Sequence, residues 1–600
     1  MDYRHRMPFG ADIQDDGSVR FQLWAPAANR VSLVPAAGGR HLPMERLEAG
    51  WFALCTAAAG PGFRYRFLID GRLEVADPAS RFQPEGVEGP SEVVDPRSYR
   101  WRSAAWCGRS WEEAVIYELH VGSFDPGGDF DGVRRRLDHL SRLGVTAIQL
   151  MPVAEVPGRW NWGYDGVLPF APRHGYGGPA GLKRLVDEAH QRGLMVLLDV
   201  VYNHFGPQGN DLPKYAPAFL SSRHRTPWGA AINFDGEGAG PVRRFFVENA
   251  LYWLEEYRFD GLRLDAVHAI IDDSRPHILI ELAEAVRRGP GRARRVHLVL
   301  ENDGNESRYL RRNEDGRARH YAAQWNDDIH HALHVLITGE SAGYYSDYAE
   351  DPIGHLLRCL QQGFAWQGET SPFRGGRRRG EPTMGLPPSA FVGFLQNHDQ
   401  IGNRPAGERI TLLAPDEAVR AATAVLLLAP SPPLLFMGQE WGSEQPFPYF
   451  CDFDEPLAND VRKGRRREFP DMPAEQLPDP TDPRTFASAV LDWRRMLTTA
   501  AQQWLDLHTR LLRLRRELIV PRLHAMHPVP GSFQRLGGQA IAAAWEGEGV
   551  GVSMLANLGP NARGGVELPP GGCIYATPRF PAQGSSVTLP PWSVAWYRWQ

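Results

Sequence analysis

Between residues 114 and 440 the chain alternates short, nearly continuous apolar runs with amphipathic segments, and this alternation limits the possible folds more than any other feature. In the segments between the runs, such as 181–193 and 241–258, apolar residues recur three and four positions apart, as on one face of an α-helix. Runs that are apolar on both faces are typical of parallel strands covered by helices. The pattern therefore predicts an α/β fold, a (β/α)8 TIM barrel, with a doubly wound sheet as the alternative. Eight runs are candidate strands: 114–121, 145–153, 194–204, 261–267, 296–302, 320–325, 390–399 and 433–440.

The two ends of the chain have a different pattern. Residues 1–105 contain short runs of alternating apolar and polar residues between Gly, Pro and Asp clusters, which is typical of a small β-sandwich. Short runs between glycines return after the helix-like segment 504–518, which we expect to close the barrel. We predict three domains: an N-terminal β-sandwich over 1–105, a barrel over 106–518 with a small inserted segment at about 205–240, and a C-terminal β-domain over 519–600.

Composition and charge exclude several classes of protein. The chain has 600 residues, 42% of them hydrophobic, and a net charge of −5, which is ordinary for a soluble globular protein. Its N-terminus has no apolar run after the basic residues, and three prolines interrupt the most apolar stretch, 421–438, so we expect a cytoplasmic protein without a membrane span. The five cysteines lack CxxC spacing, which argues against disulfides and a zinc site. We interpret the arginine-rich runs 374–380 and 462–468 as solvated loops rather than nucleic-acid contacts.

Polar residues gather where the predicted strands end. In a (β/α)8 barrel the active site forms at the carboxyl ends of the strands, so polar residues there are informative. Arg263 and Asp265 are two apart in one strand, which indicates either a structural ion pair or a catalytic carboxylate kept ionised by its arginine. Taken singly, each residue could have a structural role, and that reading is favoured for Asp199; together they favour a functional site. The residues at these strand ends are Asp199, Asn203, His204, Arg263, Asp265, His268, Glu301, His398 and Asp399.

Apart from Asp199, for which a structural role is favoured, three strand ends supply carboxylates, and this limits the chemistry. The chain contains no GxxxxGK[ST] phosphate loop and no HExxH metal motif. Glycoside hydrolysis needs two carboxyl groups, one as nucleophile or base and one as proton donor. That reaction fits the residues best.

Four segments carry a resemblance to a known family. "DVVYNH" (199–204), "GLRLDAVH" (261–268), "LVLEND" (298–303) and "FLQNHD" (394–399) resemble, in order and spacing, the conserved regions of the alpha-amylase superfamily, glycoside hydrolase family 13. The resemblance implies a retaining mechanism with Asp265 as nucleophile, Glu301 as general acid and base, and Asp399 as a stabiliser of the bound sugar. It also implies that Arg263 pairs with Asp265, and that His204 and His398 hydrogen-bond the same sugar.

A finer resemblance concerns the substrate. The opening "FGADIQDDGSVRFQLWAPAANRVSLV" and "AAQWNDDIHHALHVLITGE" (322–340) resemble the trehalose-releasing members of the superfamily. This implies hydrolysis of the α-1,4 bond next to the terminal trehalose of maltooligosyltrehalose. His268 stands where many amylases have a lysine, and we expect it to form the leaving-group side of the site together with Asp327 and Asp328. Tyr164 in "NWGYDG" either stacks on the sugar or has a packing role.

Other functions remain open at this point. A glycogen-branching enzyme, or another α-glucan enzyme of the superfamily, would use the same acids but pass the sugar to a second glucan. A non-catalytic glucan-binding protein is the alternative from another class. We expect no cofactor and no metal site, because the usual additional calcium-ligand segment after Asn203 is missing. We expect an α-glucan as the partner and no nucleic acid, and the oligomeric state stays open.

Overall fold

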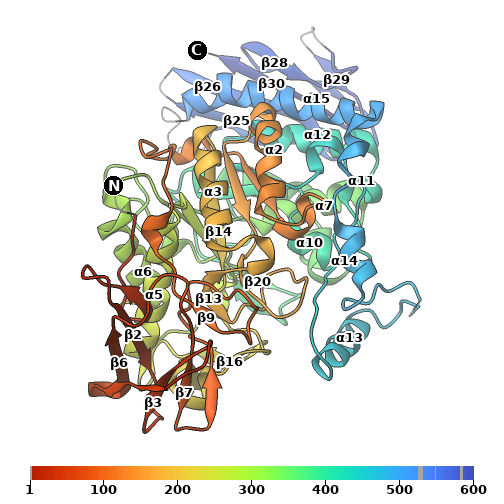
Figure 1. Ribbon diagram of the computed structural model, residues 1–600. Coiled ribbons are helices and arrows are strands. Elements are labelled where there is room, and N and C mark those ends of the chain that lie inside the picture. The colour runs from red at the N-terminus through yellow and green to blue at the C-terminus, as the bar shows by residue number, and fades with distance from the viewer. Residues whose placement is uncertain (1–2, 474, 524–530, 548, 582–585, 600) are drawn as a thin grey trace.

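A closed barrel of eight parallel strands forms the centre of the molecule (Figure 1). The structure is a computed structural model that describes residues 3–473, 475–523, 531–547, 549–581 and 586–599. Each of the eight predicted runs contains one barrel strand, so the predicted (β/α)8 fold is confirmed and the doubly wound sheet is wrong. The strands are β10 (Ile116–Leu119), β11 (Ala147–Leu150), β14 (Met195–Val200), β17 (Gly261–Leu264), β18 (His297–Leu300), β19 (Ala323–Trp325), β22 (Phe391–Phe394) and β23 (Pro433–Phe436).

Every residue of these eight strands is buried. Side chains alternate between the barrel interior and the surrounding helices, so both faces of each strand must be apolar or fully bonded. This explains why the runs are continuous instead of alternating. The main helices are α2 (Phe130–Leu143), α3 (Gly178–Gln191), α5 (Ala239–Glu256), α6 (Ile278–Arg288), α7 (Asp327–Thr338), α12 (Asp416–Leu428) and α15 (Thr499–Leu514).

Local sequence sets the helix ends. Asp129 caps α2 by accepting a hydrogen bond from the amide of Gly132, and Gly144 ends this helix with a φ of 101°, a conformation that favours glycine. After α15 the chain continues as a π-helical turn, Arg515–Ile519. The buried Arg515 side chain there donates to the carbonyl groups of Pro430 and Ser431, just before β23.

Two antiparallel sheets form the N-terminal part. The first has the strand order β1-β2-β6-β5 and the second β4-β3-β7-β8, with β9 added to β7. In Figure 1 these strands lie at the opposite side of the barrel from the C-terminal strands. The longer strands are β1 (Gly10–Ile13), β2 (Val19–Trp24), β3 (Val31–Pro35), β6 (Trp51–Thr56), β7 (Arg64–Ile69) and β8 (Leu73–Val75); the short ones are β4 (Leu42–Pro43), β5 (Glu45–Arg46) and β9 (Ser91–Glu92).

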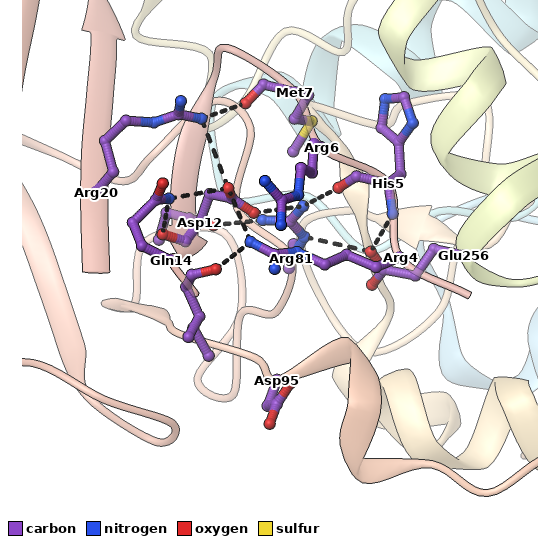
Figure 2. A network of polar contacts seen from close by, with 12 residues as sticks. Arg4, His5, Arg6, Met7, Asp12, Gln14, Arg20, Arg81, Asp95 and Glu256 are labelled. Atoms are coloured by element: carbon purple, nitrogen blue, oxygen red, sulfur yellow. Dashed lines mark hydrogen bonds and ion pairs between the residues drawn. The ribbon is translucent and has the colours of Figure 1, made fainter. Parts of the chain in front are cut away.

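A network of charged groups fixes this N-terminal part to barrel helix α5 (Figure 2). His5 lies between two carboxylates of α5, 2.8 Å from Glu248 and 2.7 Å from Glu255. Arg81 donates to the carbonyl of His5 at 2.9 Å and lies 3.7 Å from Glu256, as Figure 2 shows. Because His5, Arg81 and Glu256 are buried and the network joins both parts, the two parts have a fixed relative orientation.

The C-terminal part is again β-structure. Its five-stranded sheet has the order β24-β25-β26-β30-β28, beside a two-stranded sheet of β27 and β29. Trp596 of β30 donates to the carbonyl of Ala424 in α12, which attaches the sheet to the barrel. The bounds are β24 (Phe533–Gly537), β25 (Ala540–Gly547), β26 (Val550–Asn557), β27 (Arg563–Val566), β28 (Gly572–Ala576), β29 (Val587–Leu589) and β30 (Ser593–Trp599).

Between β14 and α5, the segment 205–240 contains the short helix α4 (Leu212–Tyr215) and a hairpin of β15 (Leu220–Thr226) and β16 (Gly229–Ile232). Among the described residues, no helix is both long and apolar enough to cross a bilayer.

The interpretation of two arginine-rich runs as solvated loops is wrong in part. Residues 462–468 belong to helix α13 (Leu457–Glu468), in which the buried Arg465 bonds backbone carbonyl groups. In 374–380, Arg379 is buried and pairs with Asp328 at 2.9 Å. A guanidinium group has enough donors to be buried when carbonyl and carboxylate oxygens surround it, and composition alone does not reveal this.

Candidate active site

Asp265 and Arg263 form a close ion pair at the end of β17. Asp265 is the first residue after this strand, and its Oδ1 lies 2.6 Å from Arg263 Nη1. The same nitrogen lies 2.8 Å from Oδ2 of Asp199, in the neighbouring strand β14. Arg263 is 2% exposed and stacks over the Trp325 ring, with 4.2 Å from Cζ to the ring centroid. The pair that the sequence indicated is thus held rigidly between two strands.

Backbone conformation links Asp265 to Glu301. Ala266, directly after Asp265, has a φ of 41°, a left-handed conformation that is strained for any residue with a side chain. Its amide donates to Glu301 Oε2 at 2.6 Å, and Asn203 Nδ2 donates to Asp265 Oδ2 at 3.0 Å. Both carboxylates are therefore fixed by neutral donors from adjacent chain segments.

The surroundings of Glu301 favour its protonated form. Glu301 follows β18, and its Oε2 lies 3.9 Å from Arg263 Nη2, farther than Asp265 lies from the same side chain. Burial raises the pKa of Glu301, and the nearby carboxylates of Asp265 and Asp399 raise it further, although Arg263 and His268 oppose them. A carboxyl group with a raised pKa can donate a proton at neutral pH.

Asp399 and His398 lie on a short helix, α10 (His398–Gly402), rather than in the predicted strand, because the Asn397 side chain caps the amides of Asp399 and Gln400. Asp399 is exposed, yet the protein around its carboxylate raises its pKa, as does the negative charge of Asp265. His398 is buried; Nδ1 lies 2.6 Å from Glu118 and Nε2 lies 2.9 Å from the Tyr164 hydroxyl.

Glu118, which sequence reasoning missed, determines the state of His398. It is fully buried in β10, and despite the opposing effect of burial its carboxylate raises the pKa of His398. The signal was a lone acidic residue inside the apolar run 114–121. Tyr164 is half-buried and donates to Asp199 at 2.8 Å, so its hydroxyl connects Asp199 with His398.

His204 stands beside an aromatic ring from the inserted segment. It is half-buried after β14, and its ring stacks on Trp228 with a centroid distance of 5.0 Å and an interplanar angle of 7°. Trp228 lies in the hairpin between β15 and β16 and is 52% exposed. Nothing in the sequence distinguished this tryptophan from the 17 other tryptophans of the chain.

On the Glu301 side, His268 and Asp327 come together with Asp303. His268 is exposed, and its Nδ1 accepts from the Asp303 amide at 3.3 Å. Asp327 begins α7; burial raises the pKa of its carboxyl group well above the usual range, and Glu301 and Asp303 raise it further. The structure thus brings His268 and Asp327 to the same end of the barrel as Glu301.

Asp328 has a different environment from Asp327. It is 0% exposed, and its two oxygens accept hydrogen bonds from Asn305, Tyr348, Ala365 and Trp366 and pair with Arg379. A carboxylate with all its lone pairs occupied by protein has no place for a sugar hydroxyl. Its geometry assigns Asp328 to holding these loops rather than to contacting substrate, contrary to our expectation.

Further residues near this side were missed by sequence reasoning. Arg374 pairs with Asp303, and Tyr344, whose pKa burial raises to about 12, lies close enough to Asp399 and Asp327 for both to raise it further. Phe373 is 50% exposed and packs edge-on against Tyr344. Tyr344, Phe373 and Arg374 lie 76 to 106 positions after His268 in the sequence, so only the fold could place them here.

One group of side chains in the described part of the chain has spacing suited to a metal ion. Ligand atoms of His224, Asp235 and Asp273 lie within 4.8 Å of one another. Arg223 already pairs with Asp235 at 2.8 Å and supplies the positive charge that a cation would otherwise provide. We assign no role to this group.

Comparisons with known proteins identify the family to which the chain is similar. Residues 93–214 match the family model described as "Alpha amylase, catalytic domain", 8–80 match "Carbohydrate-binding module 48 (Isoamylase N-terminal domain)", and 531–596 match a domain of unknown function. The chain is 44% identical to a malto-oligosyltrehalose trehalohydrolase of Saccharolobus solfataricus over 81% of this chain and 84% of that one. It is 37% identical to the Brevibacterium helvolum protein of that name over 96% and 98%, respectively.

Solved structures give the same answer for the fold. A structure described as a putative alpha amylase from Salmonella typhimurium superimposes with a TM-score of 0.94 at 43% identity, over 99% of this chain and 100% of that one. A pullulanase from Paenibacillus barengoltzii, at 22% identity and a TM-score of 0.71 over 100% and 96%, shares the fold. The confirmed barrel, the acids at its strand ends and these relatives lead to one conclusion: the chain belongs to the malto-oligosyltrehalose trehalohydrolase family, a group of glycosidases within the alpha-amylase superfamily.

Proposed function

We propose that the protein hydrolyses the α-1,4 bond next to the terminal trehalose of maltooligosyltrehalose and releases trehalose and a maltooligosaccharide. We further propose retention of anomeric configuration, with Asp265 as nucleophile, Glu301 as general acid and base, and Asp399 as the carboxylate that binds the sugar. The trehalohydrolase activity named for the relatives supports the substrate, and the arrangement of the acids supports the mechanism.

The observation that carries the mechanism is the unequal contact of one guanidinium with two acids. Arg263 lies 2.6 Å from Asp265 but 3.9 Å from Glu301. The close pair stabilises the negative charge that a nucleophile needs on Asp265, while burial raises the pKa of Glu301, as a proton donor requires. Two carboxyl groups in different protonation states are what a retaining glycosidase uses.

In the first step Asp265 attacks the anomeric carbon as Glu301 protonates the glycosidic oxygen. The C–O bond to the leaving group breaks, its electron pair stays on that oxygen, and trehalose departs with the proton of Glu301. Asp265 is then esterified to the glycosyl group. Glu301, now ionised, is stabilised by the amide of Ala266 at 2.6 Å.

In the second step Glu301 takes a proton from water, and the water oxygen attacks the anomeric carbon. The ester bond to Asp265 breaks, and both acids return to their initial states. The sugar leaves as the α-anomer because each step inverts the same carbon.

We infer that residues around Glu301 bind the leaving group, because an acid must lie beside the oxygen that it protonates. His268, Asp327, Arg374 and the exposed ring of Phe373 surround this side. Polar groups that pair with trehalose hydroxyls would be left unpaired by a plain maltooligosaccharide. This is the physical basis of a preference for maltooligosyltrehalose over maltooligosaccharides.

Product analysis with maltotriosyltrehalose tests the proposal. We expect trehalose and maltotriose in equal amounts, with α-maltotriose formed first in the proton NMR spectrum. Release of β-maltotriose would refute the retaining mechanism. Equal kcat/KM for maltotriosyltrehalose and maltopentaose would refute the substrate assignment.

A transfer assay separates the alternative of a branching enzyme. A curated branching enzyme of Vibrio cholerae is 36% identical over 46% of this chain. Incubation with amylose should leave the absorbance maximum of the iodine complex in place. A branching enzyme would instead shift this maximum and form no trehalose. Glu301→Gln serves as the control in which both reactions should stop.

A further inference from the structure

At the amino-terminal ends of the barrel strands, opposite the acids, the protein contains a cavity of about 1220 Å³. Its walls come from segments that directly precede strands: residues 110–112 before β10, 387–389 before β22 and Ala322 before β19. The end of α6 and the following turn, residues 286–295, form another wall. Trp545 of the C-terminal sheet completes it. None of the residues assigned above to glycoside hydrolysis lines this cavity.

The cavity is strongly basic. Six arginines and two acidic residues line it, in a chain whose net charge is −5. The arginines are Arg287, Arg292, Arg294, Arg295, Arg312 and Arg317. One of the two acids, Asp315, lies 3.6 Å from Arg317 and so is already paired. Arg294 lies 3.6 Å from Asp260, which is outside the lining. Glu112 is the one other acid in the described lining that can balance the remaining arginines.

Several of these guanidinium groups lack a carboxylate partner. Among the described residues, the side chains of Arg292 and Arg295 have no hydrogen-bond or ion-pair partner. Arg312 donates to the carbonyl groups of Leu310, Tyr321 and Ala322 and to no carboxylate. Burial lowers the pKa of Arg312 to about 10, and Glu112 is the one charge that opposes this effect.

The pKa of a neighbouring histidine is also lowered by the positive charge of nearby arginines. His320 is half-buried in the cavity wall, and its pKa is lowered first by burial and then by the positive charges of Arg287 and Arg319. A second hollow adjoins the first through Arg312, Asn313 and Asp315; its two arginines are matched by two acids, Glu314 and Asp315, so it adds no net charge. The positive charge is thus concentrated in one concave region, where low-dielectric walls strengthen it.

We propose that this cavity is a binding site for a small polyanion bearing two or more phosphoryl groups. Guanidinium groups offer paired N–H donors whose spacing matches phosphate oxygens. A concave site of this volume fits a compact molecule better than an extended nucleic-acid strand, which would need a groove or stripe. The buried rings of Trp111 and Trp545 in the wall add apolar surface for an attached organic group.

Calorimetry on the full chain tests the site with inorganic tripolyphosphate as the probe. We expect saturable binding of one molecule per chain that weakens as sodium chloride is added. In the double variant Arg292→Ser, Arg295→Ser, the Kd should rise at least about tenfold, because both lost groups are unpaired donors. Both side chains are exposed, so the variant should fold, which circular dichroism and unaltered trehalose release would verify.

A charge-matched control guards against a general effect of charge. The double variant Arg484→Ser, Arg494→Ser also removes two positive charges, but from exposed positions outside the cavity, where each arginine pairs with a nearby aspartate. It should bind tripolyphosphate as the unchanged protein does. An equal loss of affinity in both variants would overturn the proposal, as would the absence of saturable binding up to about 5 mM.

Two further probes separate the possible sources of the phosphoryl groups. ATP binding more tightly than tripolyphosphate would assign the apolar wall to an organic group, whereas equal affinity would assign recognition to phosphoryl groups alone; both support the site. Tighter binding of a single-stranded RNA dodecamer than of either small anion would overturn it. So would competition of tripolyphosphate with maltotriosyltrehalose, because that would place the anion at the catalytic end.

Discussion

The two ends of one barrel handle charge in opposite ways. At the carboxyl ends of the strands, Arg263 lies between the carboxylates of Asp199 and Asp265. At the amino ends, Arg292 and Arg295 have no partner among the described residues. Paired charges are held in one geometry and can differ in protonation state from their neighbours, which catalysis needs. Unpaired charges of one sign fix no geometry among themselves but attract a ligand of the other sign.

Removing a single proton-transfer group should have the largest effect at the catalytic end. Glu301→Gln keeps the shape of the side chain but cannot donate or accept the proton, so kcat should fall at least about 100-fold on maltotriosyltrehalose. The matched change at the other end, Asp315→Asn, should leave kcat unaltered. A residual rate of Glu301→Gln above about a tenth of normal would contradict the assignment of the acid.

Asp328 should matter for stability rather than for sugar binding. Asp328→Asn removes the closer carboxylate partner of the buried Arg379, at 2.9 Å, and leaves Asp303 at 3.5 Å. Breaking a buried ion pair costs about 3–5 kcal/mol, and the remaining partner places the expected cost at the lower end of that range. Urea unfolding followed by tryptophan fluorescence should show a clearly lower midpoint. Its neighbour provides the control: Asp327→Asn should not lower the free energy of unfolding at pH 7, because burial raises the pKa of the Asp327 carboxyl group and the amide removes a charge that the folded state disfavours. Equal destabilisation by the two changes would contradict the distinction.

Asp327 should affect specificity more than rate. Asp327→Ala removes a carboxylate from the leaving-group side, so the ratio of kcat/KM for maltotriosyltrehalose over maltopentaose should fall about tenfold. The measurement needs both substrates on one preparation. Asp315→Ala, at the opposite end of the barrel, should leave this ratio unaltered. An unaltered ratio in Asp327→Ala would remove this residue from the binding site.

The pair Asp327 and Asp328 also marks how far the sequence could predict this site. The barrel and the positions of Asp265 and Glu301 follow from local patterns, because an apolar run that ends in a charged residue is visible in one short window. The different environments of Asp327 and Asp328 do not, because successive helix residues point about 100° apart and their neighbours come from distant loops. Asp328 meets Arg379, 51 positions later, in a run that we interpreted as solvated.

Long-range partners explain the other omissions. His398 depends on Glu118, which lies 280 positions earlier, and the basic cavity combines segments around 290 and 315 with residues before β10 and β22. Each of these two arginine-containing segments, around 290 and around 315, resembles an exposed surface loop when it is considered by itself. Only closure of the barrel places these two segments on the wall of one cavity.

The smallest expected effect concerns pH, and it tests whether charge at the catalytic end acts through Glu301. The positive charge of His268 lowers the pKa of Glu301, whereas burial raises it. A general acid works while protonated, so activity is lost as the pH rises through its pKa. His268→Gln removes the lowering charge, and the basic limb of kcat/KM against pH should move to higher pH. His268→Lys supplies a permanent positive charge, and the same limb should move to lower pH. His320→Gln, in the basic cavity, should leave the limb in place. Shifts of the same sign in the Gln and Lys variants would show that the limb does not report Glu301, and would return the identity of the proton donor to an open question.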